Sequence, residues 1–311
     1  MVFTQWKGIF PYLVSPVDEY GKVKEQVLRN LVGASHWVWC PWTYPLGSTG
    51  EFFYLDWEQR REIVRIVVEA AAGRVPVVAG VAASTNRDAV FQAAEFERLG
   101  VDGILGILNV YFPLNQDGIY DYFASIADAV SCQVVVYNNP KFTGFEIEIP
   151  TLKRLSQISN INYYKDASGN TGRLLQLSNV VGNDLKIFSA SAHVPVFVMM
   201  LGGAGWMAGP ACLLPRESVM LYELCEKTLG RGIQTAENHV GSEPCFQKYN
   251  LAACVKAGLQ FQGFSVKSDS AEPAVGNRCT KGSGPGHRED SERVPYVLMC
   301  ELYLNIILYP I

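Results

Sequence analysis

Strand-length apolar runs alternate with helix-length amphipathic segments from about residue 6 to about residue 230. The predicted strands are 9–14, 75–81, 103–108, 133–138, 161–165, 185–189 and 205–209, with a poorer candidate at 37–46. The predicted helices include 57–72, 89–99, 119–130, 173–181 and 217–229, and Asp56 with Gln59 forms a potential capping box before the first of them. This order predicts an α/β fold, the (β/α)8 TIM barrel, in which catalytic groups gather at the carboxyl ends of the strands. A doubly wound sheet is the main competing fold, but no GxGxxG motif follows the first strand.

The pattern changes beyond residue 230. Residues 231–245 and 268–294 lose helical periodicity and become rich in Gly, Ser, Pro and charged residues, whereas 249–259 is again typical of a helix. The sequence therefore predicts a catalytic barrel domain over 1–230 and a small C-terminal helical or irregular extension over 231–311. The apolar tail 294–311 is interrupted by polar residues and prolines, so its uninterrupted runs are too short to span a bilayer.

Composition narrows the class of partner. The chain has 311 residues and a net charge of -4, which argues against nucleic acid or an anionic membrane and favours a small molecule. Its eight cysteines are dispersed without a CxxC pair, and the four histidines do not cluster with them, so no metal site is predicted. No signal peptide is evident at the N-terminus, and reduced thiols predict a cytoplasmic protein.

Lys165 stands at the end of an apolar, aromatic run and just before a polar turn, in the segment 163–170. A lysine there would sit at the mouth of the barrel, half desolvated, and burial disfavours the charged ammonium. Part of it would then be the neutral amine that attacks a ketone to form a Schiff base. A surface lysine at a strand end is the more common alternative, and this segment alone does not choose between the two.

Two further segments follow strand-like runs and carry groups that imine chemistry needs. Tyr137 lies near the end of the predicted strand 133–138, and its hydroxyl can move the proton that Schiff-base formation and C–C cleavage require. The loop Gly47-Ser48-Thr49-Gly50 offers two hydroxyls and backbone N–H groups to a substrate carboxylate. Taken alone, Tyr137 is better explained as a tyrosine that caps the barrel core, and the loop 47–50 as an ordinary Gly/Ser turn.

The order of these segments resembles the dihydrodipicolinate synthase/N-acetylneuraminate lyase family. The ordered set runs from 47–51 through 137–144 and 165–170 to 201–205, and the resemblance covers about residues 6–230 plus the helix near 249–262. It implies a TIM barrel, usually tetrameric, that holds pyruvate or another 2-oxo acid as an imine on its lysine. It also implies no metal and no organic cofactor, and a homo-oligomer, either a dimer or a tetramer.

The resemblance implies a role for each motif residue. Lys165 would form the Schiff base, and Tyr137 would shuttle protons. Ser48 would link that tyrosine to solvent, while Thr49 and its neighbouring N–H groups would hold the substrate carboxylate. Tyr111 falls where the family often sends a tyrosine into the neighbouring subunit's site.

Two departures from the family pattern affect the second half of the substrate. Phe142 stands where the synthases carry an arginine for the carboxylate of the aldehyde. Ser191 stands where the sialate lyases carry a Gly-x-Asp-Glu pattern for the sugar hydroxyls. Together with Trp206 and Met207, these residues predict a substrate pocket that is less charged than the pocket of the synthases or of the sialate lyases.

We interpret the chain as a cytoplasmic, Schiff-base-forming lyase or aldolase that acts on pyruvate or another 2-oxo acid. Its predicted partners are this acid and an aldehyde or sugar-acid substrate, with no nucleic acid and no membrane. Two alternatives within the family are a 2-oxo-3-deoxy sugar acid dehydratase or aldolase, and a true dihydrodipicolinate synthase with a relocated carboxylate contact. A non-catalytic barrel that binds a 2-oxo acid is the alternative from another class.

Overall fold

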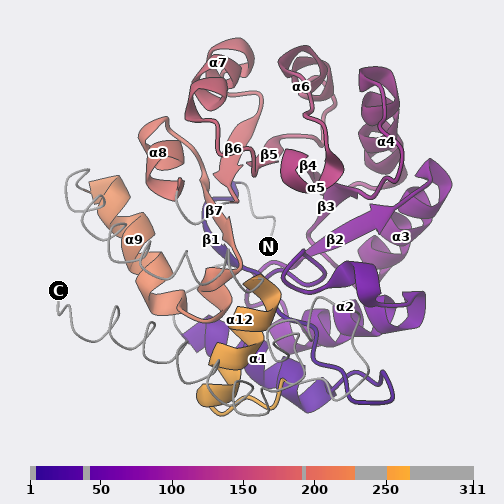
Figure 1. Cartoon of the computed structure of the whole chain (residues 1–311), viewed down its shortest axis with the longest axis vertical. Coiled ribbons are helices and arrows are strands. Elements are labelled where there is room, and N and C mark those ends of the chain that lie inside the picture. Colours follow the sequence, from indigo (N-terminus) through magenta and orange to yellow (C-terminus); the bar gives the residue numbers. More distant parts are fainter. Residues whose placement is uncertain (1–4, 38–42, 191–193, 228–250, 267–311) are drawn as a thin grey trace, which may run out of the picture.

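Seven parallel strands form one curled sheet at the centre of the molecule, surrounded by helices (Figure 1). The computed structural model describes residues 5–37, 43–190, 194–227 and 251–266. Its strands are β1 (Gly8–Pro11), β2 (Val78–Ala83), β3 (Gly103–Leu108), β4 (Gln133–Asn138), β5 (Tyr163–Asp166), β6 (Lys186–Ser189) and β7 (Gly205–Ala208). Their order in the sheet is β1-β7-β6-β5-β4-β3-β2, so β1 and β2 are the two edges.

A short segment around Tyr44 lies between these two edges. Tyr44 pairs in parallel with Tyr12, just past β1, and Thr43 pairs in parallel with Val77, just before β2. The bridges join the edges where an eighth strand would stand, so the fold is a TIM-barrel-like α/β fold. Of the predicted strand at 37–46, residues 38–42 lie outside the described residues, and the bridges at 43 and 44 are its described part. Pro45, the next residue, has no N–H to extend the ladder.

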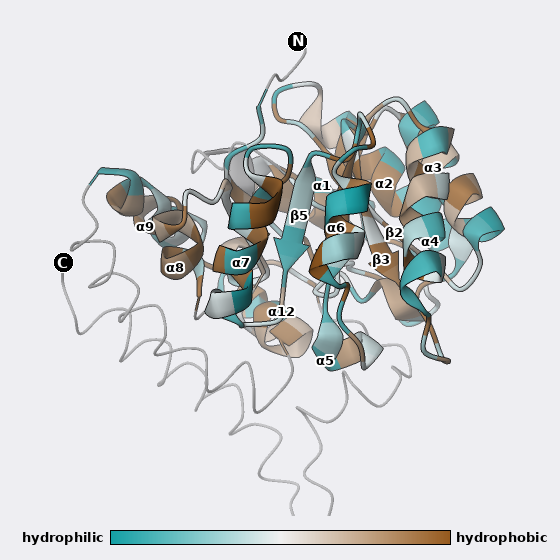
Figure 2. Cartoon of the chain, turned by 90° about the horizontal axis from the view of Figure 1, so that it is seen from above, coloured by the Kyte–Doolittle hydropathy of each residue, from teal (hydrophilic) through white to brown (hydrophobic). Residues whose placement is uncertain are grey.

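The outer layer consists of helices that follow the strands. Their bounds are α1 (Glu25–Trp37), α2 (Trp57–Ala71), α3 (Asn86–Leu99), α4 (Gln116–Ala129), α6 (Ile149–Leu155), α7 (Thr171–Val181), α8 (Pro195–Met200) and α9 (Pro215–Lys227). Shorter elements are η1 (Phe52–Tyr54), α5 (Pro140–Thr143) and η2 (Pro210–Cys212), and α12 (Leu251–Phe261) packs near η2. Hydrophilic and hydrophobic residues alternate along the turns of the outer helices (Figure 2), as expected for helices with one face on a sheet.

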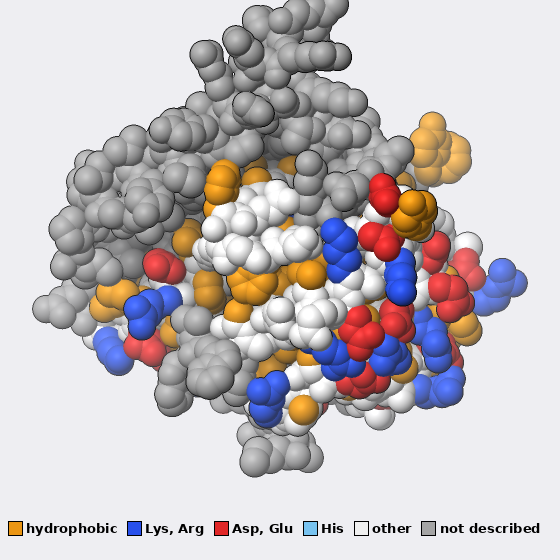
Figure 3. All heavy atoms as spheres, turned by 90° about the horizontal axis from the view of Figure 1, so that it is seen from below, with side chains coloured by type: hydrophobic (Ala, Val, Ile, Leu, Met, Phe, Trp, Pro, Cys, Tyr) orange, Lys and Arg blue, Asp and Glu red, His pale blue; other side chains and the backbone are white. Residues whose placement is uncertain are grey.

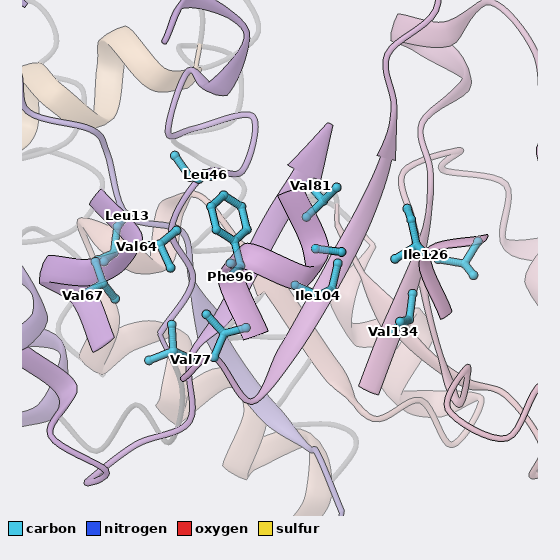
Figure 4. Packing of buried hydrophobic residues seen from close by; sticks show 14 of the residues in the cluster. Leu13, Leu46, Val64, Val67, Val77, Val81, Phe96, Ile104, Ile126 and Val134 are labelled. Carbon is cyan, nitrogen blue, oxygen red and sulfur yellow. The ribbon is translucent and has the colours of Figure 1, made fainter. Parts of the chain in front are cut away.

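Two hydrophobic layers hold this arrangement together. One fills the space between the sheet and the helices, where Val64 and Val67 of α2 and Phe96 of α3 pack with strand residues such as Val81 (Figure 4). The other lies inside the barrel, where aromatic side chains predominate, among them Phe10, Tyr12, Tyr44, Tyr137, Tyr163 and Phe188. Because side chains alternate along a strand, β2 to β6 contribute to both layers, whereas the outward-facing Ile9 of β1 and Trp206 of β7 belong to a separate outer cluster.

Most predicted elements are confirmed. The strands β3 and β4 have the predicted bounds, and the Asp56 carboxylate and the Gln59 side chain form the expected capping box at the start of α2. The helices α1, α6 and α8 were not predicted, and the last two are too short to show a clear period. The division at residue 230 stays a prediction, since most of 231–311 lies outside the described residues.

Charges of both signs are interspersed on the face seen from below (Figure 3). Ion pairs link α1 to α2, for example between Arg29 and Glu69 at 2.6 Å. Neighbouring charges of opposite sign largely cancel, so the described residues of this face form no basic stripe of the kind that binds nucleic acid. Among the described residues, no helix combines the length and apolarity needed to cross a membrane.

Candidate active site

Lys165 and Tyr137 lie side by side near the carboxyl ends of β5 and β4. The two residues are direct partners in the parallel ladder, and both side chains point into the barrel. The Lys165 Nζ atom lies 3.7 Å from the centre of the Tyr137 ring and 4.1 Å from the centre of the Tyr12 ring. The two predicted residues, 28 positions apart in sequence, are therefore brought into contact by strand register.

The amine of Lys165 is more deeply buried than the sequence predicts. Only 2% of the residue is exposed, and burial lowers the pKa of its amine well below the ordinary value. Among the described residues no carboxylate forms an ion pair with it. A neutral amine is the nucleophilic form, so this environment favours attack on a carbonyl carbon.

Asp166 shows why the neighbouring carboxylate does not neutralise this lysine. It follows Lys165 directly, so it faces the opposite side of the strand, toward the outer helices. There it accepts hydrogen bonds from Tyr164 and Ser168, each at 2.5 Å, and lies 3.4 Å from a guanidinium nitrogen of Arg173. Strand alternation thus separates a fully paired acid from a lysine without an acidic partner in the described chain.

The Tyr137 hydroxyl takes part in a small polar network. Asn139 donates a hydrogen bond to it through Nδ2 at 2.8 Å, and the Ser48 side chain hydrogen-bonds to it from the loop before η1. Burial raises the pKa of Tyr137 to about 12, and these two hydrogen bonds oppose that rise. At neutral pH the tyrosine is therefore protonated and can give its proton to a substrate oxygen.

The loop that carries Ser48 and Thr49 has an uncommon backbone. Leu46 and Glu51, on either side of it, adopt left-handed conformations with φ of 62° and 52°. Within the loop, a methyl group on Gly47 would lie 2.8 Å from the Tyr44 ring, so only glycine fits there. The Thr49 hydroxyl is buried and has no hydrogen-bond partner among the described residues, an arrangement suited to an incoming polar ligand.

A cavity of about 370 Å³ opens beside this network. Ser48, Tyr137 and Asn139 line its polar part. Lys165 is not among the lining residues, but Tyr137, whose ring lies against the Lys165 amine, belongs to both the cavity and the lysine's surroundings. The arrangement combines a desolvated amine, a protonated hydroxyl and room for a ligand.

Glu51 also ties the loop to the C-terminal helix. Its carboxylate forms an ion pair with Lys256 of α12, and the two side chains are only 13% and 11% exposed. Ala252, from the same helix, lines the cavity. The helix α12 thus contributes both a wall of the cavity and an anchor for the loop.

We expect Lys256→Met to lower the free energy of unfolding by about 3 kcal/mol, because it leaves a largely buried carboxylate without its partner. Lys153→Met is the matched control, since Lys153 pairs with Asp184 on the surface, where the two side chains are 41% and 52% exposed. That variant should lose about 1 kcal/mol or less. Urea unfolding of both variants measures the difference, and equal losses would contradict an anchoring role for Lys256.

The remaining predicted residues lie in different surroundings. Phe142, on α5, is 76% exposed and lines the cavity, whereas Tyr111 is 92% exposed and does not line it in this single chain. Met207 faces the barrel interior. Trp206 packs on the outside of the sheet with Val196 and Leu221, so the expectation that it shapes the substrate pocket is wrong. Ser191 lies outside the described residues.

Sequence reasoning missed three residues that surround the site. Tyr12 lies against the Lys165 amine, Tyr44 packs on Tyr12 with 4.1 Å between ring centres, and Asn139 bonds to the Tyr137 hydroxyl. Burial raises the pKa values of Tyr12 and Tyr44 well above the ordinary value, so both remain protonated at neutral pH. Strand alternation could have found Tyr12, which lies two positions after the inward-facing Phe10.

These features define the class of barrel proteins whose site combines a desolvated lysine with a tyrosine hydroxyl. The family model of the Dihydrodipicolinate synthetase family matches residues 5–278, and the chain belongs to this family. Its members are enzymes of the pyruvate-dependent Schiff-base aldolase and lyase type, and they use no external cofactor. In the described residues, no group of three or more metal-ligating side chains is found.

Individual relatives agree with this assignment. The chain is 31% identical to 4-hydroxy-tetrahydrodipicolinate synthase of Pelobacter propionicus over 218 residues, which cover 70% of this chain and 75% of that protein. It is 32% identical to the protein of the same name from Caldicellulosiruptor saccharolyticus over 232 residues, with coverages of 75% and 77%. Neither the sugar-acid dehydratase nor the non-catalytic binder is favoured by these matches.

Solved structures of the family share the fold. The 4-hydroxy-tetrahydrodipicolinate synthase of Methylacidiphilum fumariolicum SolV superposes with a TM-score of 0.85 at 22% identity, with 97% of each chain covered. A prophage protein of the dihydrodipicolinic acid synthase family from E. coli K12, solved in complex with pyruvate, gives 0.83 at 22% identity, covering 95% of this chain and 98% of that one. These likenesses support the TIM-barrel-like architecture.

Proposed function

We propose that this enzyme forms an imine between Lys165 and pyruvate, or a closely related 2-oxo acid, and joins or cleaves a carbon–carbon bond next to it. The observation that carries this proposal is the contact between the desolvated Lys165 amine and Tyr137 at the carboxyl ends of β5 and β4. The neutral amine attacks the 2-oxo carbon, and loss of water from the carbinolamine then gives the imine.

Tyr137 supplies the protons that these steps need. Its hydroxyl is protonated at neutral pH, so it can donate to the departing carbinolamine oxygen. The tyrosinate that results can take a proton from C3 of the imine to give the enamine, which is the carbon nucleophile. Ser48 bonds to the same hydroxyl and lines the cavity, so it is suited to pass protons between Tyr137 and solvent.

Thr49 and the neighbouring backbone are suited to hold the substrate carboxylate. The Thr49 hydroxyl is buried and has no partner in the described chain, and the N–H groups of Ser48 and Thr49 donate to no backbone carbonyl there. Gly47 lets the loop lie against the Tyr44 and Tyr12 rings. A carboxylate held here would be bound by several aligned donors.

The exposed pair Tyr111 and Phe112, with rings 4.9 Å apart, supports a homo-oligomer in which Tyr111 reaches a neighbouring subunit's site. Exposed aromatic side chains of this size commonly mark an interface. We propose a dimer or tetramer on this basis. The reduced, dispersed cysteines, of which Cys132, Cys212, Cys225 and Cys254 are free in the described chain, support a cytoplasmic enzyme.

Deuterium exchange at the pyruvate methyl group tests this function without a second substrate. The purified chain in deuterated buffer should replace the methyl protons, as seen by proton NMR, because imine and enamine interconvert on the enzyme. Lys165→Met serves as the control and should show only the background rate. Wild-type exchange at the background rate would contradict the proposed function.

A further inference from the structure

The cavity beside Tyr137 is larger than pyruvate requires. Its volume of about 370 Å³ lies in the range of sites that enclose a whole drug-sized ligand. The part near Ser48 and Tyr137 belongs to the imine chemistry described above. The remainder, formed by η1, α5 and the residues after β3, is therefore available to a second substrate.

Aromatic side chains from two separate segments flank this remainder. Phe52, Phe53 and Tyr54 come from η1, and Phe142 comes from α5. Three of them are well exposed, with 62% for Phe53, 40% for Tyr54 and 76% for Phe142. Aromatic rings left open to water at the rim of a cavity gain free energy when an apolar ligand covers them.

The described lining residues include no cation that could pair with an anion. Within the described part of the chain, no lysine or arginine lines the cavity, and Glu51 is the one ionisable carboxylate there. Glu51 forms an ion pair with Lys256, so the ammonium group of Lys256 already neutralises a carboxylate of the protein itself. A second negative charge in this cavity would be desolvated without a compensating cation.

Apart from Glu51 and the groups around Tyr137, the described polar lining consists of a few neutral side chains. Asn109 and Thr143 face the cavity beside the aromatic residues, and Asn139 already donates to Tyr137. Amide and hydroxyl groups can bond to an aldehyde oxygen or to a single hydroxyl substituent. They supply fewer donors than a polyhydroxylated chain of several carbons would need.

We propose that the second substrate is a neutral aldehyde with an aromatic or apolar body, held between η1 and Phe142. This inference rests on the proposed function. In the forward direction C3 of the enamine attacks the aldehyde carbon, one carbon–carbon bond forms, and the aldehyde oxygen takes a proton from Tyr137. Water then hydrolyses the imine and releases a 4-hydroxy-2-oxo acid, while the Lys165 amine is restored. The reverse reaction breaks the same bond.

Matched aldehydes with pyruvate test this proposal. Product formation, followed by proton NMR, should give benzaldehyde a kcat/KM about 10- to 100-fold above that of 4-carboxybenzaldehyde, the scale expected for an unpaired charge. Butanal should exceed 4-oxobutanoate in the same way, and benzaldehyde should exceed glyceraldehyde. Faster reaction of either carboxylated aldehyde, or of glyceraldehyde, would overturn the proposal.

A new arginine in the cavity provides a second test. Phe142→Arg should shift the preference between benzaldehyde and 4-carboxybenzaldehyde toward the carboxylate by about tenfold or more. Leu175→Arg is the matched control, because Leu175 is exposed on α7 and does not line the cavity. An equal shift in both variants, or none in Phe142→Arg, would overturn the role of Phe142.

The pyruvate exchange assay separates the two proposals. In one outcome, wild type exchanges the methyl protons of pyruvate and yet prefers carboxylated or polyhydroxylated aldehydes. That result would contradict the proposed class of second substrate and leave the imine function in place. A wild-type chain that exchanges no protons would sink the imine function itself.

Discussion

Replacing Lys165 with alanine is expected to lower kcat/KM by roughly 10⁴-fold or more, which is the size of loss expected when an enzyme loses its covalent nucleophile. No other group in the described interior can take over, because Tyr12 and Tyr137 beside it carry hydroxyls rather than amines. Lys165→Arg should do no better, since a guanidinium stays protonated and is a poor nucleophile. Steady-state assays with pyruvate and benzaldehyde measure these losses.

Lys165→Met separates loss of chemistry from loss of folding. Methionine fills a similar volume without an amine, so the variant should be inactive but at least as stable as wild type. Burial lowers the pKa of Lys165, and the unfolded chain therefore binds more protons between that lowered pKa and the ordinary one. Wild-type stability from this group rises with pH through that window, so the stability advantage of methionine should shrink as the pH rises toward the ordinary pKa of lysine. A methionine variant much less stable than wild type at neutral pH would contradict burial as the cause of the shift.

Replacing Tyr137 with phenylalanine is expected to lower kcat by roughly 10²–10⁴-fold, the usual contribution of a general acid or base. The substitution keeps the ring against Lys165 and removes only the hydroxyl that Asn139 and Ser48 contact. The deuterium exchange rate of pyruvate should fall together with kcat. Near-normal turnover of the Tyr137→Phe variant would contradict a catalytic role for the hydroxyl and leave Tyr137 with a role in packing alone.

Tyr163→Phe is the matched control for this prediction. Tyr163 also faces the barrel interior from β5, but its hydroxyl accepts a hydrogen bond from the Trp6 backbone N–H at 2.9 Å, and its ring stacks on Trp6. Removing that hydroxyl should cost about 1 kcal/mol of stability and leave kcat within about twofold of wild type. If Tyr163→Phe slowed turnover as much as Tyr137→Phe, a specific role for Tyr137 would not hold.

The strands and the pairing of Tyr137 with Lys165 could be predicted because they depend on local pattern. Apolar runs of strand length identify β4 and β5, and consecutive parallel strands of a barrel end at the same face. Lys165 and Tyr137 therefore had to meet once the order of the strands was right. The extent of lysine burial did not follow, because it depends on Tyr12, which is distant in sequence.

Other parts of the site depend on contacts that no local pattern records. The ion pair of Glu51 with Lys256 joins residues about two hundred positions apart, and α12 had no predicted place against the barrel. Trp206 and Met207 are adjacent and both apolar, so hydropathy could not decide which of them faces inward. The ladder decides it, since Met207 pairs with Phe10 and shares its interior orientation.

Trapping the imine tests the central claim most directly. Wild-type protein incubated with pyruvate and borohydride, then digested and analysed by peptide mass spectrometry, should carry one reduced pyruvyl group on the peptide that contains Lys165. The same treatment of Lys165→Met should give no adduct at that site. An unmodified wild-type chain, or an adduct confined to another lysine, would contradict the assignment of Lys165 as the imine-forming residue.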